Sequence, residues 1–273
     1  MLARHEAVVP VNEPLIGWYL GPFLCDLPGF SAPALDLENF TLRRVQQKKR
    51  DQFFAEQFSD VWRPEFARMM RKRFHAHASR SNSPVPLEKR SVVIKEPNGS
   101  QSADMIMSVL PHARLLFLLR DGRDVVDSEL AANMEGSWVS RGFPGMAGIS
   151  ASERRDFVIQ SAYKWLWRTA VVQRAYHDHP GPKLVIRYED LLTEPDRHVR
   201  QIFDWMGLAI SEDRLRNLVA ENAFDQTPPK ERGPDGFFRA ATPGLWRQNL
   251  SEDEQAAMIE LLAPKLIELG YET

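Results

Sequence analysis

The sequence predicts an α/β fold with a mostly parallel sheet flanked by helices on both faces. Three short apolar runs carry this prediction, and they cover residues 91–95, 114–119 and 183–188. Each run is followed by a segment in which apolar residues recur with a helical period. Strands that alternate with helices favour a parallel sheet with short connections.

The amino-terminal half adds a short strand and two helices to this pattern. Residues 7–11 predict the strand, and residues from about 36 to 79 are expected to be helical, because the apolar residues between positions 58 and 74 follow a helical period. Ser102 is expected to cap a helix that runs to Leu110. The run at 114–119 is apolar throughout, which is typical of a strand buried on both faces.

The sequence after residue 120 predicts four further helices, over about 121–134, 153–177, 194–206 and 251–270. Ser251 and Glu254 have the spacing of a capping box at the start of the last helix. Between the helices, residues 135–150 contain four glycines and predict a loop, which is a candidate lid. Residues 222–249 are expected to be irregular.

Composition narrows the class of protein. The chain has 273 residues, a formal net charge of -2 and one cysteine, Cys25. We expect no nucleic-acid partner from this charge, no disulfide framework, and a cytoplasmic location. The sequence also contains no apolar run long enough for a membrane span, and its first residues lack the apolar core of a signal peptide.

Polar side chains follow each of the three predicted strands. They are Lys95 and Glu96, Arg120 and Asp121, and Tyr188 with the two acidic residues after it. In open parallel sheets, ligands bind beyond the carboxyl ends of the strands. These positions are therefore the first candidates for a functional site.

The segment at 120–128 reads Arg-Asp-Gly-Arg-Asp-Val-Val-Asp-Ser. An arginine between a strand and a helix start can bind a phosphate, because its forked donors act together with the helix N-terminus. Ser128 lies about two helical turns further on and can donate its hydroxyl to the same anion. The alternative is that Arg120 and Arg123 only pair with the acidic residues around them.

This segment resembles the 3′-phosphate-binding signature of the sulfotransferase family, a strand followed by Arg-Asp-x-Arg-Asp-x-x-x-Ser. The resemblance implies a P-loop-NTPase-like, sulfotransferase-like fold. It also implies the co-substrate 3′-phosphoadenosine-5′-phosphosulfate (PAPS), with Arg120 and Ser128 on its 3′-phosphate. A P-loop kinase ranks low among the alternatives, because the sequence has no Walker lysine.

Two later segments also resemble the family. Residues 187–191 are similar to its Tyr-Glu-Asp strand, which makes Tyr188 a secondary candidate near the nucleotide; the alternative is a half-buried aromatic side chain. Residues 238–247 are similar to its second 3′-phosphate loop, so Arg239 is a further candidate phosphate ligand. Ala240 and Ala241 replace the family's Lys and Gly at this loop.

The family's first phosphate loop, of the form Pro-x-Ser-Gly-Thr-Thr, has no counterpart in this sequence. That loop binds the 5′-phosphosulfate through backbone N–H groups and a cation. The resemblance therefore leads us to expect that residues 1–273 are a single sulfotransferase-like domain, truncated at its amino terminus.

The resemblance places a catalytic base after the strand that precedes the signature. Glu96 is the candidate base there and Lys95 a candidate cation; the alternative is a solvent-facing ion pair. No metal is expected, because His75 and His77 do not share a helix face. The basic residues of 63–73 are either a solvated helix face or a patch for an anionic acceptor.

Two functions are consistent with these features. The first is a sulfotransferase that moves a sulfuryl group from PAPS to a hydroxyl or amine of a small-molecule or glycan acceptor. The second is a non-catalytic protein that keeps the 3′-phosphoadenosine site but has lost donor activation. The sequence identifies neither the acceptor nor the oligomeric state.

Overall fold

The computed structural model describes residues 1–16, 55–142, 148–229, 232–233 and 239–272. The chain forms two compact units, which are described one at a time. Unit 1 comprises Met1–Phe117, Arg168–Leu184 and Phe203–Ala209. Unit 2 comprises Leu118–Trp167, Val185–Ile202 and Ile210–Thr273. The strands of the described residues form two pairs, β1 with β2 and β3 with β4.

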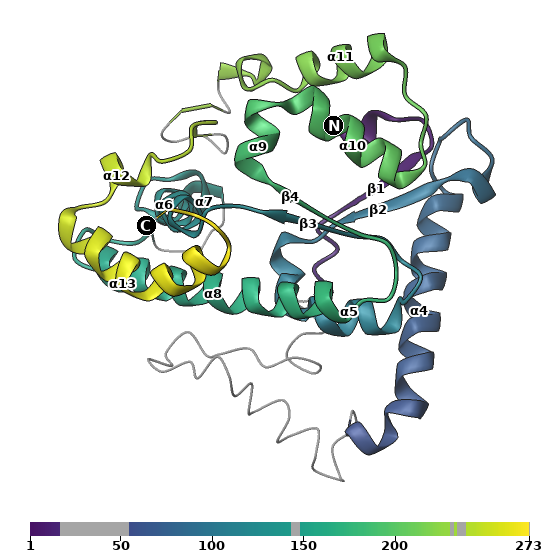
Figure 1. The fold of residues 1–273 in the computed structure, drawn as a ribbon, viewed down its shortest axis with the longest axis horizontal. Helices are drawn as coiled ribbons and strands as arrows, with labels where there is room; N and C mark the ends of the chain where they lie inside the picture. The colour runs from purple at the N-terminus through teal and green to yellow at the C-terminus, as the bar shows by residue number, and fades with distance from the viewer. Residues whose placement is uncertain (17–54, 143–147, 230–231, 234–238, 273) are drawn as a thin grey trace. The chain divides into compact units, whose positions relative to one another are not determined.

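Unit 1 contains the parallel pair of β1 (Val8–Asn12) and β2 (Ser91–Lys95) (Figure 1). Within its described residues, the complete helices are η1 (Leu2–Arg4), η2 (Glu56–Phe58), α4 (Ser59–Ser79), η3 (Leu87–Lys89), η4 (Pro97–Ser102) and α5 (Ala103–Val109). The register aligns Val8 with Ser91 and Asn12 with Lys95. Both strands therefore end at the same edge, where the chain continues to Glu13 and Glu96.

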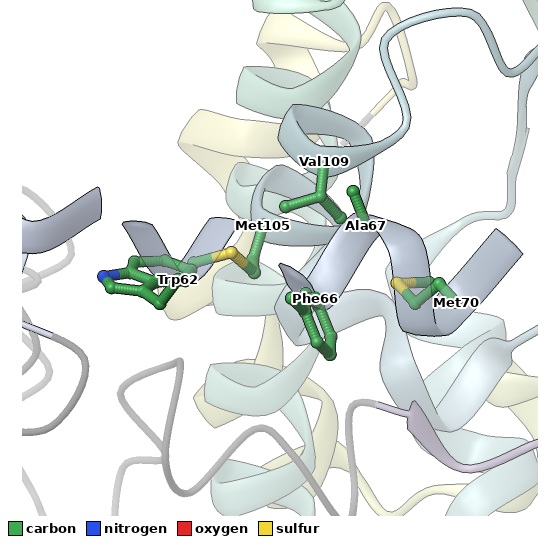
Figure 2. Packing of buried hydrophobic residues seen from close by; sticks show 6 residues of the cluster. All are labelled: Trp62, Phe66, Ala67, Met70, Met105 and Val109. Atoms are coloured by element: carbon green, nitrogen blue, oxygen red, sulfur yellow. The ribbon is translucent and has the colours of Figure 1, made fainter. Parts of the chain in front are cut away.

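A hydrophobic cluster joins α4 to α5 (Figure 2). Buried side chains recur along both helices at the i, i+4 spacing that makes one apolar stripe. The cluster consists of Trp62, Phe66, Ala67, Met70, Met105 and Val109. Ile16, four residues after β1, packs against this cluster. The segment that leaves β1 is thereby fixed between the strand ends and the helices.

Four elements have residues in both units: β3 (Leu115–Leu119), α8 (Arg154–Asp178), β4 (Lys183–Arg187) and α10 (Pro195–Met206). The expectation that the strand at 114–119 is buried on both faces is wrong. Leu118 is 50% exposed, and Val185 in the paired strand is 47% exposed. In the described residues, β3 and β4 pair only with each other, so each strand is at an edge of the sheet. The apolar character of the sequence therefore predicted more burial than the strands have.

Unit 2 contains α6 (Gly122–Asn133), α7 (Trp138–Gly142), α9 (Tyr188–Thr193), α11 (Glu212–Glu221), η5 (Phe224–Gln226), α12 (Trp246–Asn249) and α13 (Glu252–Glu268). Both α12 and α13 contact α6. The buried side chains of α13, Met258, Leu262 and Leu266, recur every four residues. Its predicted capping box is confirmed: Ser251 and Glu254 make both reciprocal bonds.

Three local expectations need correction. Ser102 occupies the N-cap of α5, but its side chain makes no capping hydrogen bond. The predicted loop at 135–150 contains α7, whose Ser140 N–H donates to the Ser137 hydroxyl. Residues 143–147 of that candidate lid lie outside the described residues. The region 222–249 includes η5 and α12, which are too short to leave a periodic apolar pattern.

Among the described residues, no helix combines the length and the apolar character that crossing a membrane requires. Across the same described ranges, histidine, cysteine and acidic side chains form no group of three that could hold a metal ion.

Candidate functional site

The strand–helix junction at the start of α6 positions Arg120 and Ser128 in unit 2. Strand β3 ends at Leu119, and Asp121 is the N-cap of α6. The Asp121 carboxylate accepts the backbone N–H of Arg123 at 2.9 Å, which satisfies one unpaired donor of the first helical turn. Arg120 is thus held between the strand and the cap, and Ser128 follows two turns along the helix.

Gly122 is required at this junction by its close packing. A Cβ atom at Gly122 would lie 2.7 Å from Cδ2 of Trp165, which is buried on α8. Ordinary contacts of a Cβ atom begin at about 3.4 Å. Glycine suits this position of the chain because the helix start packs directly on an indole ring.

The two arginines of the signature have different surroundings. Arg123 is buried and pairs with Asp121 through Nε and Nη2, and its guanidinium stacks on Trp246 at 4.9 Å. Arg120 stacks on the ring of Tyr188, also at 4.9 Å. Its Nε is buried and finds no hydrogen-bond partner in the part of the chain that the structure describes. A buried donor without a partner is costly, so it fits a site that receives an anionic ligand.

Tyr188 is the first residue of α9, directly after β4. The next residue, Glu189, links this helix to the signature, because its Oε1 accepts the backbone N–H of Asp121 at 2.9 Å. Its Oε2 accepts the hydroxyl of Tyr271 at 3.1 Å. Burial first, and then the neighbouring Glu189 carboxylate, raise the pKa of Tyr271 well above its ordinary value. The tyrosine therefore stays a proton donor to Glu189.

Arg239 reaches the site from the segment before α12. Its guanidinium forms a bidentate ion pair with Asp127, whose side chain is 2% exposed. Nδ2 of Asn249 donates to the same carboxylate at 3.0 Å. One helical turn earlier, Asp124 accepts the backbone N–H of Gly244 at 3.0 and 2.9 Å.

The carboxylates of this helix lie close enough to influence each other. Burial is the main reason that the pKa of Asp124 is raised, and the nearby negative charges of Asp121 and Asp127 raise it further. The N–H of Gly244 acts in the opposite direction.

A cavity of about 160 Å³ lies at this place, lined by Arg120, Ser128, Tyr188, Phe224, Arg239, Ala240, Ala241, Thr242 and Leu245. All of these residues belong to unit 2. The structure therefore brings the four candidate nucleotide-binding residues around one cavity. Of the alternatives left open by the sequence, pairing with Asp121 applies to Arg123 rather than to Arg120.

The other two candidates, Lys95 and Glu96, lie in unit 1 at the end of β2. The Nζ of Lys95 pairs with Oε1 of Glu13 at 2.6 Å, and both side chains are more than one third exposed. Glu13 is held there because its backbone N–H donates to the carbonyl of Lys95 at 2.8 Å. Glu13 and Leu15 have positive φ angles of 49° and 57°, which are strained for residues other than glycine.

Glu96 points toward the segment that follows β1. Its Oε2 accepts the N–H of Ile16 at 3.2 Å, and its Oε1 is buried without a partner in the described ranges. Burial is the main reason that the pKa of Glu96 is raised; the backbone N–H groups of Ile16 and Leu15 oppose this, and Glu13 adds to it. Gly99 leaves room for the Glu96 side chain, since a Cβ atom there would lie 2.3 Å from its Cγ and 2.5–2.6 Å from atoms of its carboxyl group.

The residues that the sequence did not reveal are Glu13, Asp127 and Asn249, whereas Glu189 stood among the polar residues after a predicted strand without an expected contact. Glu13 had a weak signal, because it lies two residues after the predicted strand at 7–11. Asp127 stands inside the signature, at a position where the pattern requires no particular residue. The basic residues of α4 remain exposed for the most part, with Arg68 paired to Glu65 and Arg63 stacked on Trp62.

The comparisons with known proteins agree with one another. The model of the sulfotransferase family (Sulfotransfer_3) matches residues 1–212. Protein-tyrosine sulfotransferase 1 of Danio rerio is 22% identical over 183 residues, which cover 65% of this chain and 47% of the relative. Omega-hydroxy-beta-dihydromenaquinone-9 sulfotransferase Stf3 of Mycobacterium tuberculosis is 26% identical over 144 residues, covering 51% and 35% respectively. The chain thus spans about half the length, or less, of these curated relatives.

A solved structure also matches. The mouse sulfotransferase SULT7A1 complexed with PAP has a TM-score of 0.52 and 11% sequence identity, with 96% of this chain and 84% of that chain covered. At this identity the likeness concerns the fold. It confirms the predicted fold class, an α/β architecture with parallel strands flanked by helices.

Proposed function

This chain belongs to the sulfotransferase family, and we propose that it transfers a sulfuryl group from PAPS to an acceptor hydroxyl or amine. The observation that carries the proposal is the cavity of unit 2, around which Arg120, Ser128, Tyr188 and Arg239 lie together. Two cations, a hydroxyl and an aromatic ring are the groups that a phosphorylated nucleoside needs.

Arg120 would bind the 3′-phosphate through its forked donors, and this would satisfy the buried Nε that lacks a protein partner. Ser128 would donate its hydroxyl to the same group, and Arg239 would add a second guanidinium. Tyr188 would keep the Arg120 guanidinium in place by stacking on it. When bound, the nucleotide supplies an activated sulfuryl group, whose bond to the 5′-phosphate breaks as the bond to the acceptor oxygen or nitrogen forms.

In unit 1, the proposal assigns proton transfer to Glu96 and charge stabilisation to Lys95. The raised pKa of Glu96 brings its basicity closer to neutral pH, where a general base works best. The cation of Lys95 would stabilise negative charge that develops on an oxygen.

The printed names of the two curated relatives describe transfer to a tyrosine in a protein and to the hydroxyl of a menaquinone. Both acceptors are hydroxyl groups, so a hydroxyl is the acceptor we propose first, carried by a small molecule or a glycan. The single cysteine among 273 residues supports a cytoplasmic location as part of this proposal.

The experiment is a transfer assay with sulfur-labelled PAPS and a panel of phenols, alcohols, amines and acidic glycans. We expect at least one acceptor to become labelled, with release of an equimolar amount of the product nucleotide, adenosine 3′,5′-bisphosphate (PAP). Glu96→Gln should lower turnover about 100- to 10,000-fold, whereas Glu88→Gln, at an exposed carboxylate of η3, should leave it unchanged. PAP binding without transfer to any acceptor would contradict catalysis and favour a nucleotide-binding protein.

A further inference from the structure

Helix α6 carries two carboxylates, one turn apart, that hold the segment opposite it. Asp124 accepts the backbone N–H of Gly244, and Asp127 accepts the guanidinium of Arg239. Ser128, the next residue of the helix, lines the same cavity as Arg239. The helix that bears one candidate phosphate ligand thus fixes the position of another.

The bidentate geometry leaves part of the guanidinium available. A guanidinium has five N–H donors in a rigid plane. The carboxylate of Asp127 takes one donor of Nη1 and one of Nη2. The Nε–H and the remaining donors lie along the other edges of the plane, and the edge with Nε–H and a neighbouring Nη–H matches two oxygens of a phosphate.

Asp127 is itself rigidly held. Its side chain is 2% exposed, and Asn249 of α12 donates to it in addition to Arg239. The Arg239 side chain is 20% exposed, so it is the partner on the cavity side of the pair. An arginine held in this way has already lost the rotamer freedom that binding would otherwise cost.

The lining of the cavity makes this orientation important. Among the described lining residues, Arg120 and Arg239 are the two that carry charge. Ala240 follows Arg239 where the resembling family loop has a lysine. Selection of a 3′-phosphate therefore depends on few cations, and on the direction in which each one points.

We propose that Asp127 is a positioning residue that orients Arg239 toward the 3′-phosphate and so sets the preference for 3′-phosphorylated nucleotides. This inference rests on the proposed function, because it assumes that the cavity binds the nucleotide. Asp127 acts through Arg239 and does not contact the ligand.

The test is calorimetric titration with adenosine 3′,5′-bisphosphate (PAP) and with adenosine 5′-monophosphate. Asp127→Asn should weaken PAP binding about tenfold, the equivalent of a charge-assisted hydrogen bond, and leave the monophosphate within about twofold. Glu129→Gln is the matched control, because Glu129 lies on the same helix and pairs with Lys164. It should change neither affinity.

Arg120→Ala separates this inference from the proposed function. If the unmodified chain does not prefer PAP, both the function and the inference are overturned. If it prefers PAP, and Arg120→Ala removes the preference while folded Asp127→Asn retains it in full, only the positioning role is overturned. A fall in affinity for both nucleotides alike would also overturn it, since a general loss of structure does not discriminate.

Should Asp127→Asn fail to fold, Arg239→Lys gives a second test. Lysine keeps the charge and can still pair with Asp127, but it has no second edge of donors. We expect about a tenfold fall in PAP affinity with the monophosphate unchanged. An unchanged preference for PAP in this variant would refute the argument.

Discussion

Gly122→Ala is a sharp test of how the start of α6 is built. The added Cβ atom would lie 2.7–2.8 Å from three atoms of the Trp165 ring, about 0.7 Å closer than an ordinary contact. Trp165 is buried, so the ring has little room to move. Overpacking of this kind costs about 1–3 kcal/mol. Alanine offsets up to about 1 kcal/mol of that cost, because it favours helix more than glycine does.

We therefore expect a net loss of about 1–2 kcal/mol in the free energy of unfolding, or about 2–8 °C in the melting midpoint. Because the clash displaces the turn that follows Arg120, PAP binding should weaken by about tenfold. Differential scanning calorimetry and nucleotide titration measure the two effects. Gly142→Ala is the control: no atom of the described residues lies within 4 Å of its added Cβ, so its midpoint should not fall. A Gly122→Ala protein with unchanged midpoint and affinity would refute the packing argument.

Three further predictions concern unit 2. Burial by itself would raise the pKa of Glu254, but the hydrogen bonds from Arg154 and Ser251 outweigh burial, so the pKa is lowered. The ionised Glu254 side chain therefore stabilises the fold above a pH of about 4.5, and this stabilisation is lost as the pH falls below that value. In urea unfolding, Glu254→Gln should be less stable than the unmodified chain by about 3 kcal/mol at pH 7, and this difference in stability should shrink at acidic pH. A stability difference that does not depend on pH would contradict the ion pair. Tyr271→Phe should cost about 1–2 kcal/mol in the same assay, because Glu189 loses a donor, and no loss would exclude that bond. Ser251→Ala should cost about 1 kcal/mol through the lost cap, and equal stability would argue against the capping box.

The sequence located the candidate nucleotide site through local patterns. The position of Arg120 follows from an apolar run, then the arginine and then a helix start, since strand ends and helix starts are adjacent in the chain. The spacing to Ser128 follows from helix geometry alone. Tyr188 and Arg239 depended on the family resemblance, and the structure places both beside the same cavity.

The contacts that organise the site were beyond sequence reasoning. Asp127 meets Arg239 and Asn249 across more than 100 residues, and Glu189 meets Tyr271 across 82. Such pairs depend on tertiary packing, which no periodicity records. An acidic residue in a charge-rich helix start is usually solvated, so only the structure distinguishes Asp127 from its neighbours.

The burial of the strand at 114–119 was also difficult to predict from its sequence. Its apolar residues suited a strand covered on both faces, yet Leu118 is half exposed. A run of apolar residues reports β propensity as well as burial, and the two cannot be separated without knowing which strands pair.

The most direct measurement for the central claim is a crystal structure of the chain with PAP. The account predicts that the 3′-phosphate lies within hydrogen-bonding distance of the Arg120 guanidinium and the Ser128 hydroxyl, with Arg239 presenting its Nε edge to the same group. A 3′-phosphate bound elsewhere on the chain, with Arg120 still lacking an anionic partner, would contradict it.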